Sequence, residues 1–351
     1  MIYNIAVLGG DGIGPEVTAE AVKVLKKISD KFNIQFDFRY FLVGGSSYDE
    51  YKTPLTDGAF DGIKQCDSIL FGAIGGPKWD NIDKSLRPEQ ALFRLRGGLN
   101  LFANLRPVYL FEELIDACPL KSEIVSGGLN IMIVRELTGG IYFGRKWTDG
   151  DTANDLMTYS AHEIERIIDV AIKIANKRSG IITSVDKANV LETSRLWRRI
   201  FDNKTQNSSL KANNLLVDNA AMQLIRNPRQ FDVIVTENLF GDILSDEASM
   251  LTGSIGMLPS ASLGEGSFGM YEPIHGSAPD IAGKGMANPM ACILSAAMML
   301  RYSFDLPEAA DCIENAVKAV LKKGLRTADI ARAGEKTVST SDIGDAIGNC
   351  I

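Results

Sequence analysis

The stretch FDVIVTENLFGDILSDEASM, residues 231–250, decides which fold and which chemistry we expect of this chain. Residues 231–236 form a short β-branched apolar run, which predicts a buried strand. Asn238 and Gly241 interrupt this pattern, so we expect a helix to begin at Asp242. Asp242 and Asp246 then lie four positions apart, which places both carboxylates on one helix face near the N-terminus.

Two carboxylates at this spacing repel each other unless a positive charge lies between them. Mg²⁺ is a natural candidate, because it binds carboxylate oxygens and keeps water or substrate oxygens as its other ligands. The alternative is that both acids simply complement the dipole of the first helical turn. The rest of the sequence has to distinguish these two interpretations.

Composition limits the class of protein. The 351 residues suggest roughly two domains of about 150 residues each. A net charge of −7 argues against nucleic acid as the main partner, because neutralising phosphates requires a basic surface. Five cysteines without a CxxC pair suggest reduced thiols, and two histidines are too few for a multi-histidine zinc site. With neither a signal sequence nor an apolar run long enough to span a bilayer, we expect a soluble cytoplasmic protein without membrane contact.

A glycine-rich turn follows the first predicted strand, at 2–8. The turn is GGDGIGPE, residues 9–16, and a helix opened by Pro15 leads to a second strand at 35–42. This βαβ unit invites a Rossmann interpretation, but the glycines run G-x-G-x-G before the proline, whereas the fingerprint is G-x-G-x-x-G. Asp11 would also point a carboxylate at a pyrophosphate. We therefore reject the Rossmann interpretation.

An arginine-rich helix is predicted after Pro88. The segment PEQALFRLRGGLNLFANLRP, residues 88–107, combines a helical apolar pattern with three arginines, and the glycines at 97 and 98 are expected to end the helix early. Arginines beside Leu92 and Phe93 suit a small acid that carries both carboxylates and a hydrocarbon branch. The alternative is a solvated helix face.

Later strands end in polar residues. A strand at 131–135 leads into ELTGGIYFG, residues 136–144, which suggests a hairpin. A strand at 180–186 ends at Lys187, and a lysine beside an acid at the carboxyl end of a strand lies where α/β sheets place ligands. Asp218 is expected to cap a helix.

Three segments lack periodicity. Residues 202–209, DNKTQNSS, and residues 252–269, rich in glycine and serine, are expected to form an exposed loop and a loop or crossover. Residues 271–289, YEPIHGSAPDIAGKGMANP, form a longer loop. Loops of this length inside compact domains are usually functional.

Seven motifs occur in order over essentially the whole chain. They are GGDGIGPEV, LRGGLNLFANLRP, VRELTGGIYFG, SVDKANVL, VDNAAMQL, TENLFGDILSDEASML and EPIHGSAPDIAGKGMANP. Together they resemble the β-decarboxylating dehydrogenase family, which includes 3-isopropylmalate, isocitrate, homoisocitrate and tartrate/malate dehydrogenases. The resemblance implies an α/β fold of two domains, with a dinucleotide site that is not of the Rossmann type. It places a discontinuous cofactor-binding domain at 1–101 plus 255–351 and a metal, substrate and dimerisation domain at 102–254.

The family's site residues carry over position by position. The catalytic tyrosine and lysine are matched by Tyr142 and Lys187. The arginines that hold the substrate carboxylates are matched by Arg96, Arg106 and Arg135. The ligands of Mg²⁺ or Mn²⁺ are matched by Asp218, which also faces the substrate, Asp242 and Asp246. In the family the lysine and one aspartate reach into the neighbouring subunit, so the resemblance implies an obligate homodimer in which Lys187 and Asp218 face Asp242 and Asp246 of the other copy.

The loop 272–288 matches the family's own dinucleotide site. The resemblance places His275 and Asn288 against adenine, and the phosphates and ribose against Gly276, Ser277 and Ala278. Asp280 stands where NAD-dependent members hold an acid against the ribose hydroxyls, whereas NADP-dependent members carry basic or aromatic residues. Because an acid repels a 2′-phosphate, Asp280 with Ile281 favours NAD.

Substrate choice depends on the residues before Arg96. Isocitrate dehydrogenases of this family use a serine-bearing loop there, and the stretch from Pro88 to Arg96 contains no serine. Leu92 and Phe93 instead offer an apolar wall for an isopropyl group, with Glu89 of the cofactor-binding set nearby. The resemblance therefore implies NAD-dependent oxidative decarboxylation of 3-isopropylmalate, a small dicarboxylate. Phe93 stands where a leucine is more usual, which leaves activity on smaller malates open.

Two alternatives remain. A sister enzyme, a tartrate/D-malate or homoisocitrate dehydrogenase, would use the same machinery. A catalytically silent regulatory paralogue would be expected to lose the lysine, the tyrosine or an aspartate, and all of these are present.

The chemistry itself fits these residues: a base takes the hydroxyl proton while hydride leaves, CO₂ departs, and a tyrosine protonates the enolate that a divalent metal stabilises.

Overall fold

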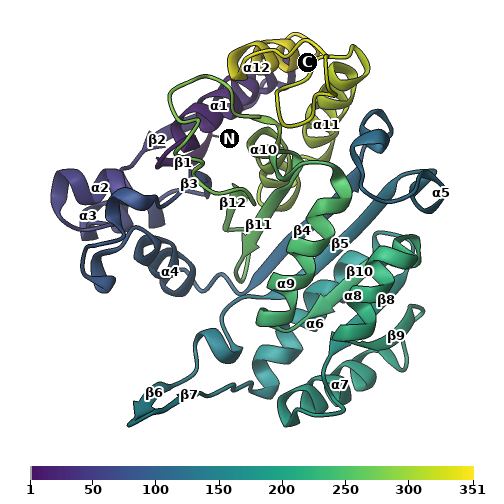
Figure 1. The fold of residues 1–351 in the computed structure, drawn as a ribbon. Coiled ribbons are helices and arrows are strands. Elements are labelled where there is room, and N and C mark those ends of the chain that lie inside the picture. Colours follow the sequence, from purple (N-terminus) through teal and green to yellow (C-terminus); the bar gives the residue numbers. More distant parts are fainter. Residues whose placement is uncertain (1) are drawn as a thin grey trace. The chain divides into compact units, whose positions relative to one another are not determined.

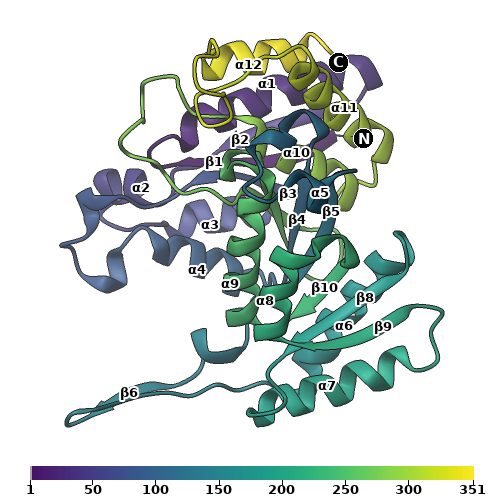
Figure 2. The ribbon, with the colours of Figure 1, turned by 45° about the vertical axis from the view of Figure 1, so that its right-hand side comes forward.

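The chain folds into two compact α/β units in the computed structural model, which describes residues 2–351 (Figures 1 and 2). Unit 1 comprises Met1–Leu101 and Gly253–Ile351, and unit 2 comprises Phe102–Thr252. The chain therefore leaves unit 1, builds unit 2 and returns. It re-enters unit 1 at residue 253, two residues before the expected boundary at 255.

The strands of unit 1 have the order β2-β1-β3-β12-β11. Three of them are parallel: β1 (Ile2–Gly10), β2 (Gln35–Tyr40) and β3 (Ser68–Ala73). β12 (Gly269–Pro273) runs parallel to β3, and β11 (Pro259–Leu263) is antiparallel to β12. Every residue of β3 is buried, as a parallel strand covered on both faces requires.

Strand β11 lies inside the segment 252–269, so the prediction of a loop or crossover there was wrong. Ser260 and Ser262 are buried, and Ser260 Oγ donates a hydrogen bond of 3.1 Å to the Glu272 carbonyl oxygen on β12. Ladder pairing and small buried side chains hold this strand. It lacks the β-branched and aromatic residues by which strands are recognised.

Helix α10 (Met290–Tyr302) is the core helix of unit 1. Every residue from Met290 to Leu300 is buried, as expected of a helix that packs on all sides. It contacts β11, β12 and β3 as well as α1 (Gly14–Phe32) and α11 (Pro307–Lys322), and α12 (Thr340–Gly348) packs on α1 and α11. The shorter helices are α2 (Gly45–Tyr51), α3 (Asp57–Lys64) and α4 (Glu89–Gly98).

Helix α4 runs through both glycines that were expected to end it early. Gly98 leaves room for the Phe60 ring, which packs against the helix: a Cβ atom at residue 98 would lie 2.6 Å from that ring. The chain leaves the helix after Leu99, through Asn100 with a left-handed φ of 51°.

Asp11, in the glycine-rich turn between β1 and α1, faces the protein interior rather than a ligand. Its carboxylate accepts hydrogen bonds from the N–H groups of Gly45, Ser46 and Gly75, each at 2.8 Å. Burial raises the pKa of this carboxyl group. Asp11 therefore joins the turn to the start of α2 and to the loop after β3.

The strands of unit 2 have the order β4-β5-β10-β8-β9. Their bounds are β4 (Ala103–Leu110), β5 (Leu129–Glu136), β10 (Val233–Thr236), β8 (Ile181–Asp186) and β9 (Lys211–Leu216). β4 is antiparallel to β5, and the other strands run parallel to β5. The carboxyl ends of the parallel strands therefore meet at one edge, where α/β folds place ligands.

Helices cover the sheet of unit 2. α6 (Ala161–Asn176) contacts β5, β10 and β8 and packs on α7 (Glu192–Thr205). α9 (Asn238–Ser249) packs on β5 and on α8 (Val217–Arg226), and α5 (Ser122–Val125) is a single turn. α7 extends to Thr205, into the stretch 202–209 that was expected to be a loop.

Helix α9 begins at Asn238, four residues earlier than expected. Gly241 lies inside the helix because Arg135 packs against it: a Cβ atom there would lie 2.6 Å from Arg135 Cγ. Asp242 and Asp246 therefore lie beyond the first turn, where the helix dipole contributes little. The dipole interpretation of these two acids is wrong.

The predicted hairpin at 136–144 is also wrong. The Glu136 carboxylate accepts hydrogen bonds from the N–H groups of Thr138 and Gly139, at 2.9 and 2.7 Å, so the chain curls directly after β5 into a 3-10 turn, Gly140–Tyr142. The hairpin follows later, as β6 (Lys146–Asp149) and β7 (Thr152–Asp155). Gly150, with a φ of 57°, forms its tight turn, and Figure 2 shows the hairpin extending away from the rest of unit 2.

Within residues 2–351 we find no helix that is both long and apolar enough to cross a membrane. The five cysteines are free thiols, as their spacing led us to expect.

Three buried carboxyl groups lie at the carboxyl ends of the parallel strands of unit 2. Glu136 is bound by main-chain amides, and Asp186 accepts two hydrogen bonds from Arg198, at 2.8 and 2.9 Å. Glu237 receives fewer hydrogen bonds than the other two carboxyl groups. Oε1 accepts a hydrogen bond from Ser194, and Oε2 is buried without a hydrogen-bond partner in the described part of the chain. Burial, opposed by the Ser194 hydrogen bond and assisted by Asp186, raises the pKa of Glu237 to about 7.

Glu237→Gln should stabilise the protein most at alkaline pH. With a folded-state pKa of about 7 against an ordinary value of 4.5, the neutral carboxyl group stabilises the fold fully below about pH 4.5. This contribution, about 3 kcal/mol, is lost as the pH rises through about 7. The amide stays neutral and still accepts the Ser194 hydrogen bond. We expect the gain in melting temperature over the wild type to grow from about pH 5 to about pH 8, as measured by circular dichroism.

Glu165→Gln, at an exposed position of α6, is the matched control. Its melting temperature should differ from that of the wild type by the same small amount at pH 5 and at pH 8. A gain from Glu237→Gln that is independent of pH would contradict the raised pKa of Glu237.

Candidate active site

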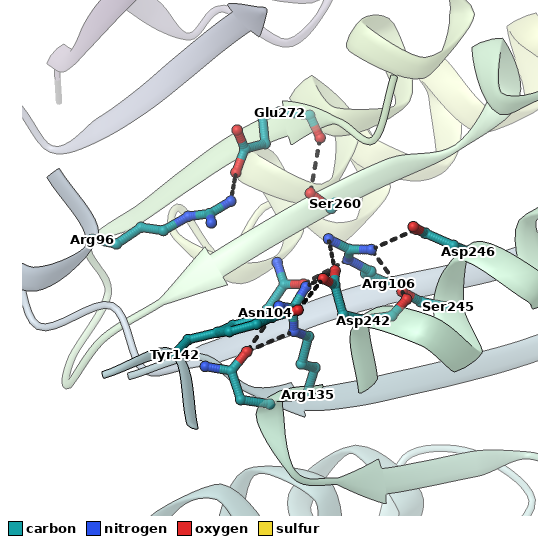
Figure 3. Close-up of polar contacts among 11 residues, drawn as sticks. Arg96, Asn104, Arg106, Arg135, Tyr142, Asp242, Ser245, Asp246, Ser260 and Glu272 are labelled. Atoms are coloured by element: carbon teal, nitrogen blue, oxygen red, sulfur yellow. Dashed lines mark hydrogen bonds and ion pairs between the residues drawn. The ribbon is translucent and has the colours of Figure 1, made fainter. Parts of the chain in front are cut away.

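Arg135, near the carboxyl end of β5, is the central cation of unit 2 (Figure 3). Its side chain is 5% exposed, and Nη1 donates to Asp242 Oδ1 at 2.5 Å. Nε and Nη2 both donate to Asn238 Oδ1, at 3.1 and 2.8 Å. Asn238 in turn donates from Nδ2 to the Gly139 carbonyl oxygen at 3.1 Å. The start of α9 thus fixes the guanidinium, and the guanidinium orients Asp242.

Arg106, on β4, is the second cation and spans both aspartates (Figure 3). Nη1 donates to Asp246 Oδ1 at 3.2 Å and to Ser245 Oγ at 2.6 Å, and Nη2 lies 3.8 Å from Asp242 Oδ1. Nε donates to Asn104 Oδ1 at 2.8 Å, which holds the guanidinium plane. The repulsion between the two carboxylates is therefore relieved from within the chain.

Tyr142, in the 3-10 turn after β5, completes this cluster (Figure 3). Its hydroxyl donates to Asp242 Oδ2 at 2.9 Å, and Arg135 Cζ lies 6.0 Å from the centre of its ring. Partial burial and the neighbouring Asp242 carboxylate raise the pKa of the phenol. The side chain is still 40% exposed, so its proton is within reach of a bound ligand.

Asp242 and Asp246 have the donor chemistry that a hard divalent cation needs. Their side chains are 34% and 67% exposed, so both carboxylates are accessible. Mg²⁺ and Mn²⁺ take carboxylate oxygens of this kind. Among residues 2–351, no group of three histidine, cysteine or acidic side chains in one chain could hold a metal ion. The pair thus fits such a cation and leaves ligand positions for other groups.

Lys187 and Asp218 form a separate pair in unit 2. Lys187 directly follows β8, and its Nζ donates to Asp218 Oδ1 at 2.6 Å. This hydrogen bond holds the pKa of the Asp218 carboxyl group below its usual range. The predicted cap is wrong: Leu216 occupies the N-cap position of α8, and Asp218 lies in the first turn and faces the lysine.

The loop after β12 contains an orphaned polar atom. His275 Nδ1 lies 2.9 Å from the Gly276 carbonyl oxygen, whereas Nε2 is buried and has no hydrogen-bond partner among residues 2–351. Burial lowers the pKa of the imidazole, which favours its neutral form. If Nδ1 carries the proton that binds Gly276, Nε2 is left as an acceptor. An adenine amino group has the donor that such an acceptor requires.

Apart from Glu89, the other residues predicted for the dinucleotide site lie along the same loop. Ser277 is buried, Ala278 has a strained φ of 39°, and Asp280 is exposed. Gly276 is exposed and Ile281 half-buried. The Asn288 side chain is used internally: Oδ1 accepts the Met290 N–H at 3.0 Å and Nδ2 donates to Asp329 at 3.1 Å. Contact of Asn288 with a ligand would therefore come from its main chain.

Arg96 and the apolar wall belong to unit 1. Arg96 Nη2 donates to Glu272 Oε1 at 2.9 Å, and Glu272 is buried on β12 (Figure 3). Leu92 packs against the hydrophobic core of unit 1, whereas Phe93 is 48% exposed. Glu89 opens α4, and a Cβ atom on Gly75 would lie 2.7 Å from its carboxylate.

The structure brings five predicted site residues together in unit 2: Arg106, Arg135, Tyr142, Asp242 and Asp246. Sequence reasoning missed the amides and the hydroxyl that position the arginines, on Asn104, Asn238 and Ser245. Asn238 could have been found, because it closely follows the end of β10, a place where α/β folds carry functional residues. Asn104 and Ser245 carry no signal in the sequence.

Comparison with known proteins finds that the chain is similar to dehydrogenases. The model of the isocitrate/isopropylmalate dehydrogenase family matches residues 4–347. The chain is 56% identical to a 3-isopropylmalate dehydrogenase of Halalkalibacterium halodurans, over 99% of the chain and 97% of that protein. It is 54% identical to a 3-isopropylmalate dehydrogenase of Clostridium acetobutylicum, over 98% of both chains.

Two solved structures show the same fold. An isocitrate dehydrogenase from Methylococcus capsulatus matches with a TM-score of 0.87 and 33% identity, over 99% of both chains. A β-decarboxylating dehydrogenase from Thermococcus kodakarensis, in its apo form, matches with a TM-score of 0.83 and 36% identity, over 99% of this chain and 96% of that one.

Proposed function

Because the chain belongs to the isocitrate/isopropylmalate dehydrogenase family, we propose that it converts (2R,3S)-3-isopropylmalate to 4-methyl-2-oxopentanoate and CO₂ with NAD, a step of leucine biosynthesis. Membership confirms the resemblance of the seven motifs, and the solved structures confirm the fold class. The observation that carries the proposal is the cluster in which Arg106, Arg135 and Tyr142 converge on Asp242.

The arginines bind the substrate. Arg135 presents a buried guanidinium fork and Arg106 a half-buried one, and the contacts of both are oriented, which suits the bidentate binding of carboxylates. Arg96 serves as a third carboxylate ligand and is oriented by Glu272. Leu92 and the exposed Phe93 ring supply the apolar wall for the isopropyl group. Unit 2 is the metal, substrate and dimerisation domain, and unit 1 is the cofactor-binding domain.

Asp242 and Asp246, with Asp218 of a second copy, hold the divalent cation. When bound, Mg²⁺ or Mn²⁺ would supply Lewis-acid chemistry to the substrate, and nicotinamide would supply a hydride acceptor. Lys187 of the second copy takes the hydroxyl proton as the alcohol is oxidised to a ketone. After the β-carboxylate departs as CO₂, the Tyr142 hydroxyl gives its proton to the carbon that carried that carboxylate.

The loop after β12 binds NAD. The free Nε2 of His275 accepts a hydrogen bond from the adenine amino group, and the Asn288 main chain faces the adenine edge. Gly276, Ser277 and Ala278 line the phosphates and ribose, and Glu89 belongs to the same site. The exposed Asp280, with Ile281, binds the ribose hydroxyls and repels a 2′-phosphate, which selects NAD over NADP.

Exposed apolar side chains support a homodimer. Met222 and Ile225 of α8 are 61% and 44% exposed, Ile243 of α9 is 56% exposed, and Met250, just after α9, is 63% exposed. α8 and α9 pack on each other, so these side chains lie on neighbouring helices, and a second copy of the same face would bury them. The free thiols support a cytoplasmic location.

The proposal is tested by NADH production from 3-isopropylmalate, isocitrate, homoisocitrate, D-malate and tartrate, offered separately with Mg²⁺. We expect turnover of 3-isopropylmalate, a loss of turnover on addition of EDTA, and its return with excess Mg²⁺ or Mn²⁺. Turnover of D-malate alone would keep the chemistry and overturn the role of Leu92 and Phe93. If none of the acids is oxidised, the protein is a silent paralogue.

Lys187→Ala should abolish turnover and leave NAD binding nearly intact, because the amine acts on the substrate hydroxyl. NADH fluorescence titration measures binding, and initial rates measure turnover. A loss of NADH binding together with turnover would mean that the lysine has a structural role.

Mixing two inactive variants tests whether the site is shared. Lys187→Ala and Asp242→Asn homodimers should each be inactive, whereas unfolding and refolding them together gives heterodimers with one intact site. Random assortment should restore about a quarter of the wild-type activity. A refolded mixture that stays inactive, beside wild type refolded in the same way, would place both residues in one subunit's site.

Asp280→Lys should shift preference from NAD toward NADP, because it replaces a repelling acid with a cation for the 2′-phosphate. The ratio of kcat/KM values for the two cofactors measures the shift, and Asp305→Lys, at an exposed position of unit 1, is the control. An unchanged ratio would remove Asp280 from the cofactor site.

A further inference from the structure

The loop from Ile274 to Pro289, between β12 and α10, has neither helix nor strand to hold it. Ordering such a segment costs conformational entropy for every residue. A loop that is already ordered before the ligand arrives avoids this cost at the moment of binding. Three parts of unit 1 hold the loop in place: the glycine-rich turn, Glu16 and Thr340.

The glycine-rich turn provides the first anchor. The Ile13 N–H donates to the Ser277 carbonyl oxygen at 2.8 Å. Gly12, with a left-handed φ of 58°, lets the two segments approach: a Cβ atom there would lie 2.0 Å from the same oxygen. The loop therefore lies directly on the turn, and the requirement for glycine at residue 12 comes from this contact.

Glu16, in the first turn of α1, provides the second anchor. Its Oε1 accepts a hydrogen bond of 2.5 Å from the Gly283 N–H, close to the middle of the loop. Its Oε2 is buried and has no hydrogen-bond partner among residues 2–351. Burying a carboxylate oxygen in this way has a cost, which the contact with the loop and the N-terminus of α1 offset.

Thr340, at the start of α12, provides the third anchor. Its N–H donates to the Gly285 carbonyl oxygen at 2.9 Å, and its hydroxyl donates to the Ala287 carbonyl oxygen at 2.6 Å. The residue is 3% exposed, so these bonds are shielded from water. Because α12 packs on α1, the second and third anchors lie on neighbouring helices that support each other.

We propose that Glu16 and Thr340 are positioning residues for the cofactor, which hold the dinucleotide loop in its binding conformation without touching the ligand. The inference rests on the proposed function, since it assigns the loop to NAD. The proposal gives the GGDGIGPE motif a role that does not involve phosphate. The turn and the first turn of α1 form hydrogen bonds to the loop and so hold its conformation.

The experiment compares three substitutions with a matched control. Glu16→Ala removes the acceptor of the Gly283 N–H, and Thr340→Val removes the hydroxyl while preserving the shape of the side chain. Glu16→Gln retains an acceptor oxygen. Glu308→Ala is the control, because Glu308 follows Pro307 in the first turn of α11 as Glu16 follows Pro15 in α1, and it is exposed.

Two readouts separate positioning from catalysis. Glu16→Ala and Thr340→Val should each raise the KM for NAD and the Kd for NADH about tenfold, while kcat at saturating NAD stays within about twofold. Trypsin should also cleave the ligand-free variants faster after the exposed Lys284, measured by mass spectrometry. Glu16→Gln should recover most of the affinity and of the protection, and Glu308→Ala should match the wild type in both.

Three outcomes would overturn the inference. Unchanged cleavage after Lys284 and unchanged KM in both variants would mean that the anchors do not order the loop. A raised KM with unchanged cleavage would mean that Glu16 or Thr340 acts on the cofactor directly. Faster cleavage with an unchanged KM would mean that the conformation of the loop does not matter for NAD. Should the wild type bind no NAD at all, the proposed function fails, and the cleavage rates still report on the anchors.

Discussion

The buried guanidinium of Arg135 is the constraint on which the candidate site depends. A charge that is 5% exposed must be surrounded by acceptors, and here Asp242 and Asn238 supply them. Both acceptors lie on α9, so satisfying the arginine fixes where that helix starts and how close it comes to β5. Gly241 makes the approach possible, because any side chain at that position would occupy the space of Arg135. The position of Asp242 is thus a consequence of the burial of Arg135.

The charge balance around this arginine explains how the proposed site would accept an anionic substrate and a cation together. Arg106 and Arg135 balance Asp242 and Asp246, and Lys187 balances Asp218, so the formal charges of these six side chains sum to zero. A substrate with two carboxylates brings two negative charges, and a divalent cation brings two positive ones. In the proposed site, ligand binding replaces the ion pairs between the arginines and the aspartates. The arginines then pair with the substrate carboxylates, and the aspartates pair with the cation. Neither ligand is then bound against an uncompensated charge.

Sequence patterns predicted the parts of this structure that depend on local periodicity. β1, β5, β8 and β10 were predicted in this way. The errors came where tertiary contacts override local preference: Gly241 and Gly98 resemble helix breakers, yet each fills a place that admits no side chain. In the candidate site, the four-residue spacing of Asp242 and Asp246 correctly predicted that both lie on one helix. Their partners come from β4 and β5, more than a hundred residues away, so the pairing could not be derived from spacing. The resemblance of ordered motifs supplied those positions.

The glycine-rich turn shows why local signatures have to be checked against contacts. A strand, a cluster of glycines and a helix are shared with dinucleotide-binding turns, in which the glycines let the backbone approach a pyrophosphate. Here the space beside Gly12 is taken by Ser277, and Asp11 turns inward to three main-chain amides. The glycine at residue 12 therefore allows two segments of the same chain, the turn and the loop after β12, to approach each other. The contact joins the turn to the loop after β12, the segment that we propose for the dinucleotide, so two short motifs far apart in the sequence form one structural unit. This explains why neither motif alone predicts the function.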